Sequence, residues 1–135
     1  MSLQPLVGPR IRLRLLCEED SAALVLAAAD GELWNLPFTN VPSAKTIDDY
    51  IRTALKGHVA GTMIPFVVQL RGDDRTIGAT RFLRLDRKNR KVEIGSTWFG
   101  KSWQRTFVNT EAKYLMLRFA FERMNCIRVQ LIADE

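Results

Sequence analysis

Residues 92–121 read VEIGSTWF-GKSWQRTF-VNTEAKYLMLRFAF, and the rest of the chain is organised around them. The first eight residues are apolar, β-branched and aromatic, and Gly95 interrupts them; this predicts a strand with a bulge or a close backbone approach. The polar middle predicts a short turn. The last part repeats apolar residues every three or four positions, as one face of a helix does: Val108, Ala112, Leu115, Met116, Phe119 and Ala120.

A strand that passes through a short turn into a helix leaves backbone N–H groups of that turn without partners. The helix dipole adds partial positive charge at the same place. We therefore expect this junction to hold an anion, most often a phosphate group.

The same stretch carries a resemblance to a known family. The residues that carry it are Glu93-Ile94-Gly95, Thr97-Trp98, Trp103-Gln104, Val108-Asn109-Thr110-Glu111-Ala112-Lys113 and Cys126-Ile127-Arg128-Val129, extended by Leu13-Arg14-Leu15 and Gly78-Ala79-Thr80. On these residues the chain resembles the GNAT superfamily of acyl-CoA-dependent N-acetyltransferases, within it the ribosomal-protein N-terminal acetyltransferase-like subgroup. The resemblance covers nearly the whole chain.

The family's pyrophosphate loop, Q/R-x-x-G-x-G/A, corresponds here to Gln104–Asn109. Phe107 and Asn109 stand where the pattern has small residues; asparagine is usual in the subgroup, so Phe107 is the larger departure. We expect the Phe107 ring to turn inward, because burying it gains about 1.5–3 kcal/mol. If the ring turned outward, it would cover the expected phosphate-binding site.

The resemblance implies acetyl-CoA as co-substrate, with its diphosphate on the backbone of the turn and its pantetheine arm paired with the preceding strand. The coenzyme-binding residues expected on this basis are Ile94, Gly95, Ser96, Thr97, Gln104, Arg105, Thr106, Phe107, Val108, Asn109 and Thr110. One strand amide would lie near the thioester oxygen, where developing negative charge needs stabilisation. Trp98 is expected in the core. No metal is expected.

Glu93 is the best placed carboxylate for a general base, because it begins the strand that carries the acyl donor. The alternative is a surface glutamate paired with Lys91 or a neighbouring arginine. Glu111, near a helix start, is expected to support the dipole and the cap instead. Lys113 and Arg105 either neutralise coenzyme phosphates or are solvated.

Patterns elsewhere predict further elements: strands at Ile11–Leu16, Pro65–Leu70, Thr76–Leu85 and Ile127–Ile132, a helix ending at Ala29, and a helix from Thr46 to Gly57. His58 is expected just past that helix, in a structural or exposed position. Gly78 needs a close backbone approach to be tolerated within a strand. In the loop Glu32–Ser43, Trp34 and Phe38 either pack on the core or bind the acceptor substrate.

We expect one domain over residues 1–135 with an α+β fold: a GNAT-like mixed twisted sheet, an antiparallel meander plus one parallel β-α-β pair, with helices on both faces. The family continues past the last strand into a helix and a β-hairpin that complete the coenzyme site and often supply the general acid. The chain is therefore C-terminally truncated relative to the family, as a fragment or a naturally short product. An uncovered strand edge at Ile127–Ile132 would favour association into a homo-oligomer, or poor stability.

Composition fits a soluble, cytoplasmic protein: 47% of the residues are hydrophobic, no run is long enough to span a membrane, and there is no visible secretory signal. Two cysteines do not indicate a disulfide framework. The net charge of +5 favours anionic partners. The basic cluster Arg84–Lys91, however, is typical of a solvated hairpin tip rather than a nucleic-acid surface.

Together these observations predict transfer of an acetyl group from acetyl-CoA to a primary amine, on a protein N-terminus or a small molecule, by direct attack. The alternative is a non-catalytic acyl-CoA-binding or interaction module, which the bulk of Phe107 favours. A nucleic-acid-binding domain has only the charge in its support. The sequence does not name the acceptor.

Overall fold

The computed structural model describes residues 3–35 and 41–132. One six-stranded sheet runs through it in the order β1-β2-β3-β4-β5-β6. The strands are β1 Leu6–Val7, β2 Ile11–Leu15, β3 Ile64–Leu70, β4 Thr76–Asp86, β5 Lys91–Phe99 and β6 Arg128–Leu131. Each predicted strand is therefore present, with no boundary shifted by more than one residue.

The sheet is mixed, as expected. Strands β1 to β5 pair antiparallel with their neighbours, and β6 pairs parallel with β5. A parallel pair needs a crossover connection, and the helix α3 (Phe107–Glu122) supplies it. The α+β fold class predicted from the sequence is confirmed.

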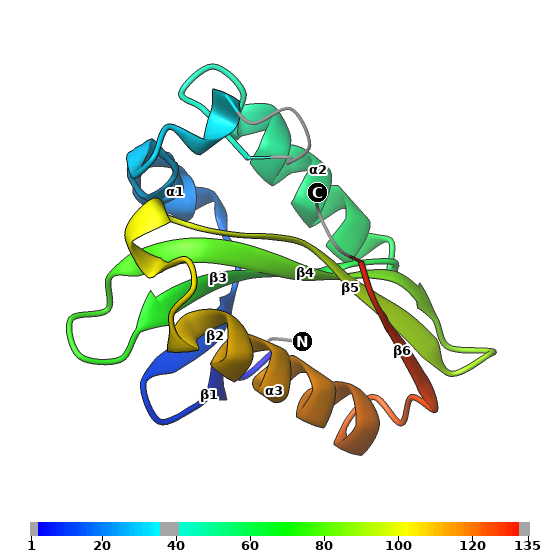
Figure 1. Ribbon diagram of the computed structural model, residues 1–135. Helices are drawn as coiled ribbons and strands as arrows, with labels where there is room; N and C mark the ends of the chain where they lie inside the picture. Colours follow the sequence, from blue (N-terminus) through cyan, green and yellow to red (C-terminus); the bar gives the residue numbers. More distant parts are fainter. Residues whose placement is uncertain (1–2, 36–40, 133–135) are drawn as a thin grey trace.

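Helices cover both faces of the sheet, as Figure 1 shows. The helices α1 (Ser21–Ala29) and α2 (Ile47–Val59) lie on one face, and α3 lies on the other. Strand β3 shows the consequence: Phe66 and Val68 pack with the α3 core, whereas Val67 packs with the α1 and α2 core. A strand covered on both sides is apolar throughout rather than alternating, which is why this segment reads as a continuous hydrophobic run.

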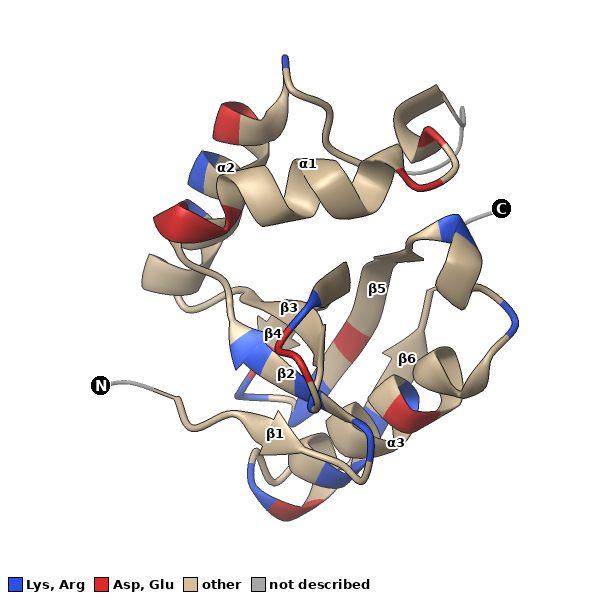
Figure 2. Cartoon of the chain, turned by 90° about the vertical axis from the view of Figure 1, so that its left-hand side faces the viewer, with Lys and Arg blue, Asp and Glu red and all other residues tan. Residues whose placement is uncertain are grey.

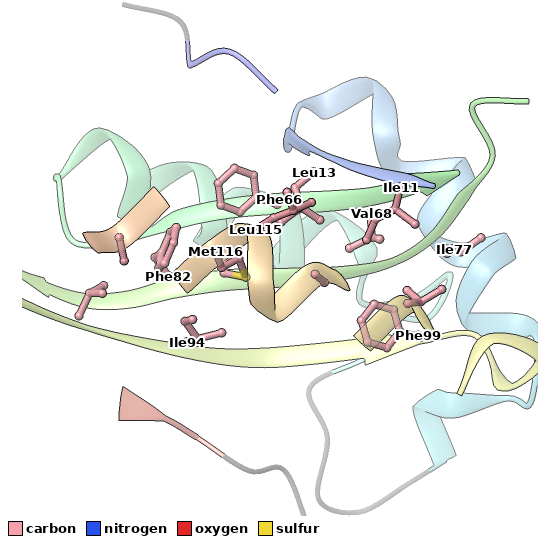
Figure 3. Packing of buried hydrophobic residues seen from close by; sticks show 14 of the residues in the cluster. Ile11, Leu13, Phe66, Val68, Ile77, Phe82, Ile94, Phe99, Leu115 and Met116 are labelled. Carbon is pink, nitrogen blue, oxygen red and sulfur yellow. The ribbon is translucent and has the colours of Figure 1, made fainter. Parts of the chain in front are cut away.

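The core between the sheet and α3 is the larger one (Figure 3). Its most deeply buried side chains include Phe66, Phe82, Ile11, Leu13, Ile94 and Met116. The rings of Phe66 and Phe82 meet edge to face with their centroids 5.8 Å apart. This core fixes α3, and with it the turn that precedes α3, against β5.

The end of α2 differs from the expectation. Gly57 does not stop the helix, which continues to Val59, so His58 lies within the last turn. Its ring Nδ1 is 3.2 Å from the carbonyl oxygen of Met63. Glycine costs a helix only about 1 kcal/mol, and the packing of α2 on β3 outweighs that cost.

Thr46, where the helix was predicted to begin, instead precedes the first residue of α2, and its side chain does not cap the helix. Its Oγ1 instead accepts a hydrogen bond of 2.9 Å from the N–H of Ser43.

Charged residues are spread over strands, turns and helices rather than gathered in one stripe (Figure 2). Residues Arg87–Arg90 between β4 and β5 are exposed, as a solvated hairpin tip should be. None of the helices within the described residues is long and apolar enough to cross a bilayer.

Candidate active site

Strand β5 contains a bulge at the centre of the predicted site. Ala79 faces Trp98 across the β4–β5 pair and Arg81 faces Gly95, so β5 holds one extra residue between these two positions. Ser96 takes up the distortion with a φ of 49°. The bulge expected near Gly95 is therefore confirmed, and its left-handed residue is Ser96.

The bulge also changes which face the β5 side chains occupy. Ile94 is buried in the α3 core, whereas Trp98 is buried in the α1 and α2 core. Residues four apart in a regular strand would share a face, so the extra residue reverses the alternation. Trp98 lies in the core as predicted, and its indole N–H donates to the Tyr50 hydroxyl at 3.1 Å.

Beyond the bulge, the outer edge of β5 is open. The pairing with β6 ends at Ile94 and Leu131, and the N–H of Ile132 donates to the Ile94 carbonyl at 2.9 Å. Among the described residues no strand pairs with Gly95–Phe99 on that side. An extended ligand can therefore add to this edge as another strand would.

The start of α3 lies close by in sequence and carries a well-formed cap. Thr106 has an extended backbone, and its Oγ1 accepts from the N–H of Val108 at 3.3 Å. The same hydroxyl donates to the Trp103 carbonyl at 2.6 Å. The Gln104 amide donates to the Phe99 carbonyl at 3.0 Å, which fixes the turn to the end of β5.

Several backbone N–H groups of this turn have no hydrogen-bond partner among the described residues. Within the described residues, no hydrogen bond uses the N–H of Arg105, Phe107 or Asn109. Arg105 has a φ of 59°, so the chain turns sharply just before the helix. Successive free amides at a helix start are the arrangement that binds phosphate.

The Phe107 ring lies on the inner side of the turn. It packs against the α3 core and meets Trp103 edge to face at a centroid distance of 6.5 Å. The guanidinium carbon of Arg10 lies 3.6 Å from the centroid of the same ring. This is the orientation expected from the gain on burial.

Between the bulge and α3 is a small polar cluster. The hydroxyls of Thr80 and Thr97 are 2.7 Å apart, and Lys113 Nζ donates to Thr97 Oγ1 at 3.3 Å. Lys113 therefore extends from α3 toward β5. Its ammonium group lies on the α3 side of the open edge rather than only in solvent.

The predicted base Glu93 is paired. Its carboxylate accepts a 2.8 Å hydrogen bond from Arg84, and the side chains are 20% and 72% exposed, respectively. Glu93 also lines a cavity of about 300 Å³ with Arg84, Asp86, Lys91, Val92, Arg128 and Gln130. A larger cavity of about 750 Å³ lies along α2 and the start of α1, away from these residues. The structure thus shows the ion pair with an arginine, and catalysis by Glu93 stays a prediction.

Glu111 has a different role from the one expected. It is 8% exposed, and its Oε2 accepts 2.8 Å hydrogen bonds from the backbone N–H groups of Arg10 and Ile11. Glu111 therefore joins α3 to the start of β2 instead of serving its own helix terminus. No local pattern signals this contact, because its partners lie about a hundred positions earlier in the chain.

The two predicted acceptor-binding aromatics are only partly described. Trp34 lies in the short 3₁₀ turn Leu33–Asn35 and is 36% exposed, whereas its neighbour Leu33 is buried in the α1 and α2 core. Leu33 thus packs on the core and leaves Trp34 at the surface. Phe38 lies outside the described residues.

The acetyltransferase (GNAT) domain family matches residues 10–135, nearly the entire chain. The chain belongs to this family. It is therefore an acetyltransferase of the GNAT type, and the open strand edge and helix start occupy the region in which the resemblance places the coenzyme. No curated protein sequence matches the chain significantly.

Solved structures agree on the GNAT fold. A Vibrio cholerae protein assigned as a ribosomal-protein-serine acetyltransferase is 21% identical over 99% of this chain and 76% of its own, with a TM-score of 0.83. RimL, a ribosomal L7/L12 alpha-N-protein acetyltransferase, is 15% identical over 95% and 70%, with a TM-score of 0.82. RimJ from Mycobacterium smegmatis, in complex with CoA-disulfide, is 20% identical over 96% and 69%, with a TM-score of 0.76.

Proposed function

We propose that this GNAT chain binds acetyl-CoA along the edge of β5 and the start of α3 and transfers the acetyl group to a primary amine. The observation that carries the proposal is the conjunction of two open backbone surfaces: the edge Gly95–Phe99 and the N–H groups of Arg105, Phe107 and Asn109. One is suited to an extended amide-bearing arm and the other to a diphosphate.

The chemistry follows from these positions. The amine nitrogen attacks the thioester carbonyl carbon, the C–S bond breaks, and the coenzyme leaves as a thiolate that takes up a proton. A β5 amide beside the bulge at Ser96 stabilises the developing oxyanion. Glu93, after exchanging its bond to the exposed Arg84, accepts a proton from the acceptor's ammonium group, directly or through a water, and the neutral amine then attacks.

The acceptor is an amine on a protein N-terminus or on a small molecule. RimL is an alpha-N-protein acetyltransferase of ribosomal L7/L12, and RimJ is seen with bound CoA-disulfide. Both share the fold of this chain, which supports an N-terminal amine and a coenzyme A thioester as the two substrates.

Coenzyme binding is tested by two variants at one position. Phe107 is the first residue of α3 and follows an extended Thr106, so proline fits there; Phe107→Pro removes both the ring and the N–H. Phe107→Ala removes the ring and keeps the N–H. Calorimetry with acetyl-CoA should show at least about tenfold weaker binding for the proline variant than for the alanine variant, because a hydrogen bond to a charged group is lost. Equal affinities of the two variants for acetyl-CoA would refute the proposed diphosphate-binding site.

Catalysis is tested by thiol release with a panel of amines. Glu93→Gln should lower kcat by about 10²–10⁴-fold, whereas Arg84→Ala, which only frees the carboxylate, should leave most of the activity. A Glu93→Gln enzyme that is as active as the wild type would remove Glu93 from the mechanism.

The second candidate function is a non-catalytic acyl-CoA binder. The pairing of Glu93 with Arg84 favours it, because that pair occupies the carboxylate that a base would need free. Acetyl-CoA binding without thiol release for any amine would support the binder and exclude the enzyme.

Association through β6 is a further part of the proposal. This strand is at the edge of the described sheet. Its Leu131 is 52% exposed, and Ile127, just before the strand, is 65% exposed. Exposed apolar edges pair with other chains. Light scattering should show a dimer or a larger species; a monodisperse monomer with a cooperative melt would contradict this.

A further inference from the structure

Arg81 on β4 is the only buried lysine or arginine among the described residues, with 4% of its surface exposed. The buried carboxylates have partners: Asp20 pairs with Arg14, and Glu111 accepts from the chain at Arg10 and Ile11. No described carboxylate pairs with Arg81. No ion pair among the described residues therefore offsets its charge.

The contacts of Arg81 leave part of its hydrogen-bonding capacity unused. Its guanidinium carbon lies 4.4 Å from the centroid of the Tyr50 ring, and Nη1 lies 3.7 Å from the Met63 sulfur. Nη2 is buried with no hydrogen-bond partner. A cation–π contact uses the face of the guanidinium, so the N–H donors in its plane still need acceptors. An unpaired buried cation is costly, which indicates that something negative completes this site.

The position of Arg81 connects it to the reaction. Arg81 faces Gly95 across the β4–β5 pair, beside the bulge, and Glu93 is the next residue of β5 on the same face. Both side chains project toward the α1 and α2 side, because Val92 and Ile94 point into the α3 core. Diagonal neighbours on adjacent strands lie about 7–8 Å apart. The candidate base and the buried guanidinium are therefore spaced so that one small acceptor could span them.

We infer that Arg81 binds a carboxylate of the acceptor, so that the preferred acceptor is an amine with a carboxylate no more than one residue away. This rests on the proposed transferase function. A guanidinium pairs with a carboxylate through two parallel N–H donors. One unpaired cation matches a singly charged carboxylate, whereas a phosphate dianion would bring an uncompensated charge among apolar groups. A free amino acid and a peptide with an N-terminal aspartate or glutamate both offer this chemistry.

The test compares acceptors that differ only in that charge. One arm sets a free amino acid against its amide, and the other sets a peptide with N-terminal Asp against the same peptide with Asn. In at least one arm the wild-type kcat/KM should favour the carboxylate by on the order of 100-fold. The arm that shows the preference identifies the source of the carboxylate. No preference in either arm would overturn the inference.

Variants of Arg81 separate recognition from a structural role. Arg81→Met keeps an unbranched side chain and removes the charge; it should lower kcat/KM far more for the carboxylate acceptors than for the neutral ones, and so abolish the preference. Arg81→Lys keeps the charge without the planar fork and should give an intermediate preference. An equal loss for charged and neutral acceptors in both variants would mean that Arg81 only supports the fold.

A binding measurement keeps this inference distinct from the function on which it rests. The N-acetylated amino acid and its amide are added to the wild type and to Arg81→Met, and the melting temperature is followed. Stabilisation of the wild type alone, and by the carboxylate alone, supports the Arg81 site even if no amine supports thiol release. Thiol release without any carboxylate-specific stabilisation or rate preference leaves the transferase standing and removes the Arg81 site.

Discussion

Replacing Glu111 by alanine should destabilise the protein strongly for a single substitution in a helix. Its Oε2 accepts from two backbone N–H groups, those of Arg10 and Ile11, each at 2.8 Å. Leaving a buried donor unsatisfied costs about 1–3 kcal/mol. Arg10 is partly exposed, so water can replace one of the two bonds, and we expect a loss of about 2–4 kcal/mol in the free energy of unfolding.

The assay is urea unfolding followed by tryptophan fluorescence, with calorimetry for the melting temperature. For a domain of this size each kcal/mol lowers the melting temperature by about 3–5 °C, so a drop of about 6–20 °C is expected. Glu122→Ala is the matched control in the same helix: its carboxylate is 62% exposed and lies 3.4 Å from Arg118. Such an exposed pair contributes no more than about 0.5 kcal/mol.

Glutamine at position 111 provides the finer test. Both N–H groups bond the same oxygen, so an amide oxygen can replace it; the charge assistance and the 3.4 Å bond from Arg10 Nε to the other oxygen are lost. Glu111→Gln should therefore lie between the wild type and Glu111→Ala. The reasoning would be refuted if Glu111→Ala and Glu122→Ala unfolded with the same free energy.

Two further perturbations test the packing of β4 and the thiol beside Asp20. Gly78→Ala places a Cβ in steric overlap with the Trp98 carbonyl oxygen, so it should cost more than about 2 kcal/mol in urea unfolding. Gly72→Ala is the control: its Cβ meets nothing within 4 Å, so it should be nearly neutral. Comparable stabilities of the two variants would disprove the close approach. Burial, and then the hydrogen bond and charge of Asp20, raise the pKa of the Cys17 thiol. Alkylation of Cys17, followed by peptide mass, should therefore be slower at pH 8 than that of an ordinary thiol and should be faster in Asp20→Asn. Because the pKa of Cys17 is raised in the folded state, the contribution of Cys17 to stability is lost as the pH rises through that pKa.

Much of the fold can be predicted from local patterns. The strand, turn and helix of residues 92–121 follow from β-branched alternation, a polar break and a helical repeat, and the structure has them as β5, a 3₁₀ turn and α3. Gly78 was expected to need a close backbone approach, and the Trp98 carbonyl supplies it. These features depend on neighbours in sequence or on one adjacent strand, so a short window of residues contains their cause.

The prediction that Gly57 ends α2 was wrong because the cause of the helix end lies outside such a short window. A glycine is a local stop signal of about 1 kcal/mol, whereas α2 packs in one core cluster with Val67 of β3 and Leu24 of α1, which lie outside the window. The bulge was expected near Gly95, but Ser96 adopts the positive φ. The pairing of both flanking segments with β4 determines which residue of the bulge adopts the positive φ.

The sequence alone determined the order of the elements and the position at which a strand is followed by a helix whose first amides are free. It could do so because periodicity and turn residues extend over only a few consecutive positions. Only the tertiary structure decided that Glu111 joins α3 to β2 and that Arg81 is buried without a counter-charge. It also decided that Glu93 meets Arg84. Contacts between distant segments arise from how the sheet and helices pack, and the energy of a charged group depends on that packing rather than on its neighbours along the chain.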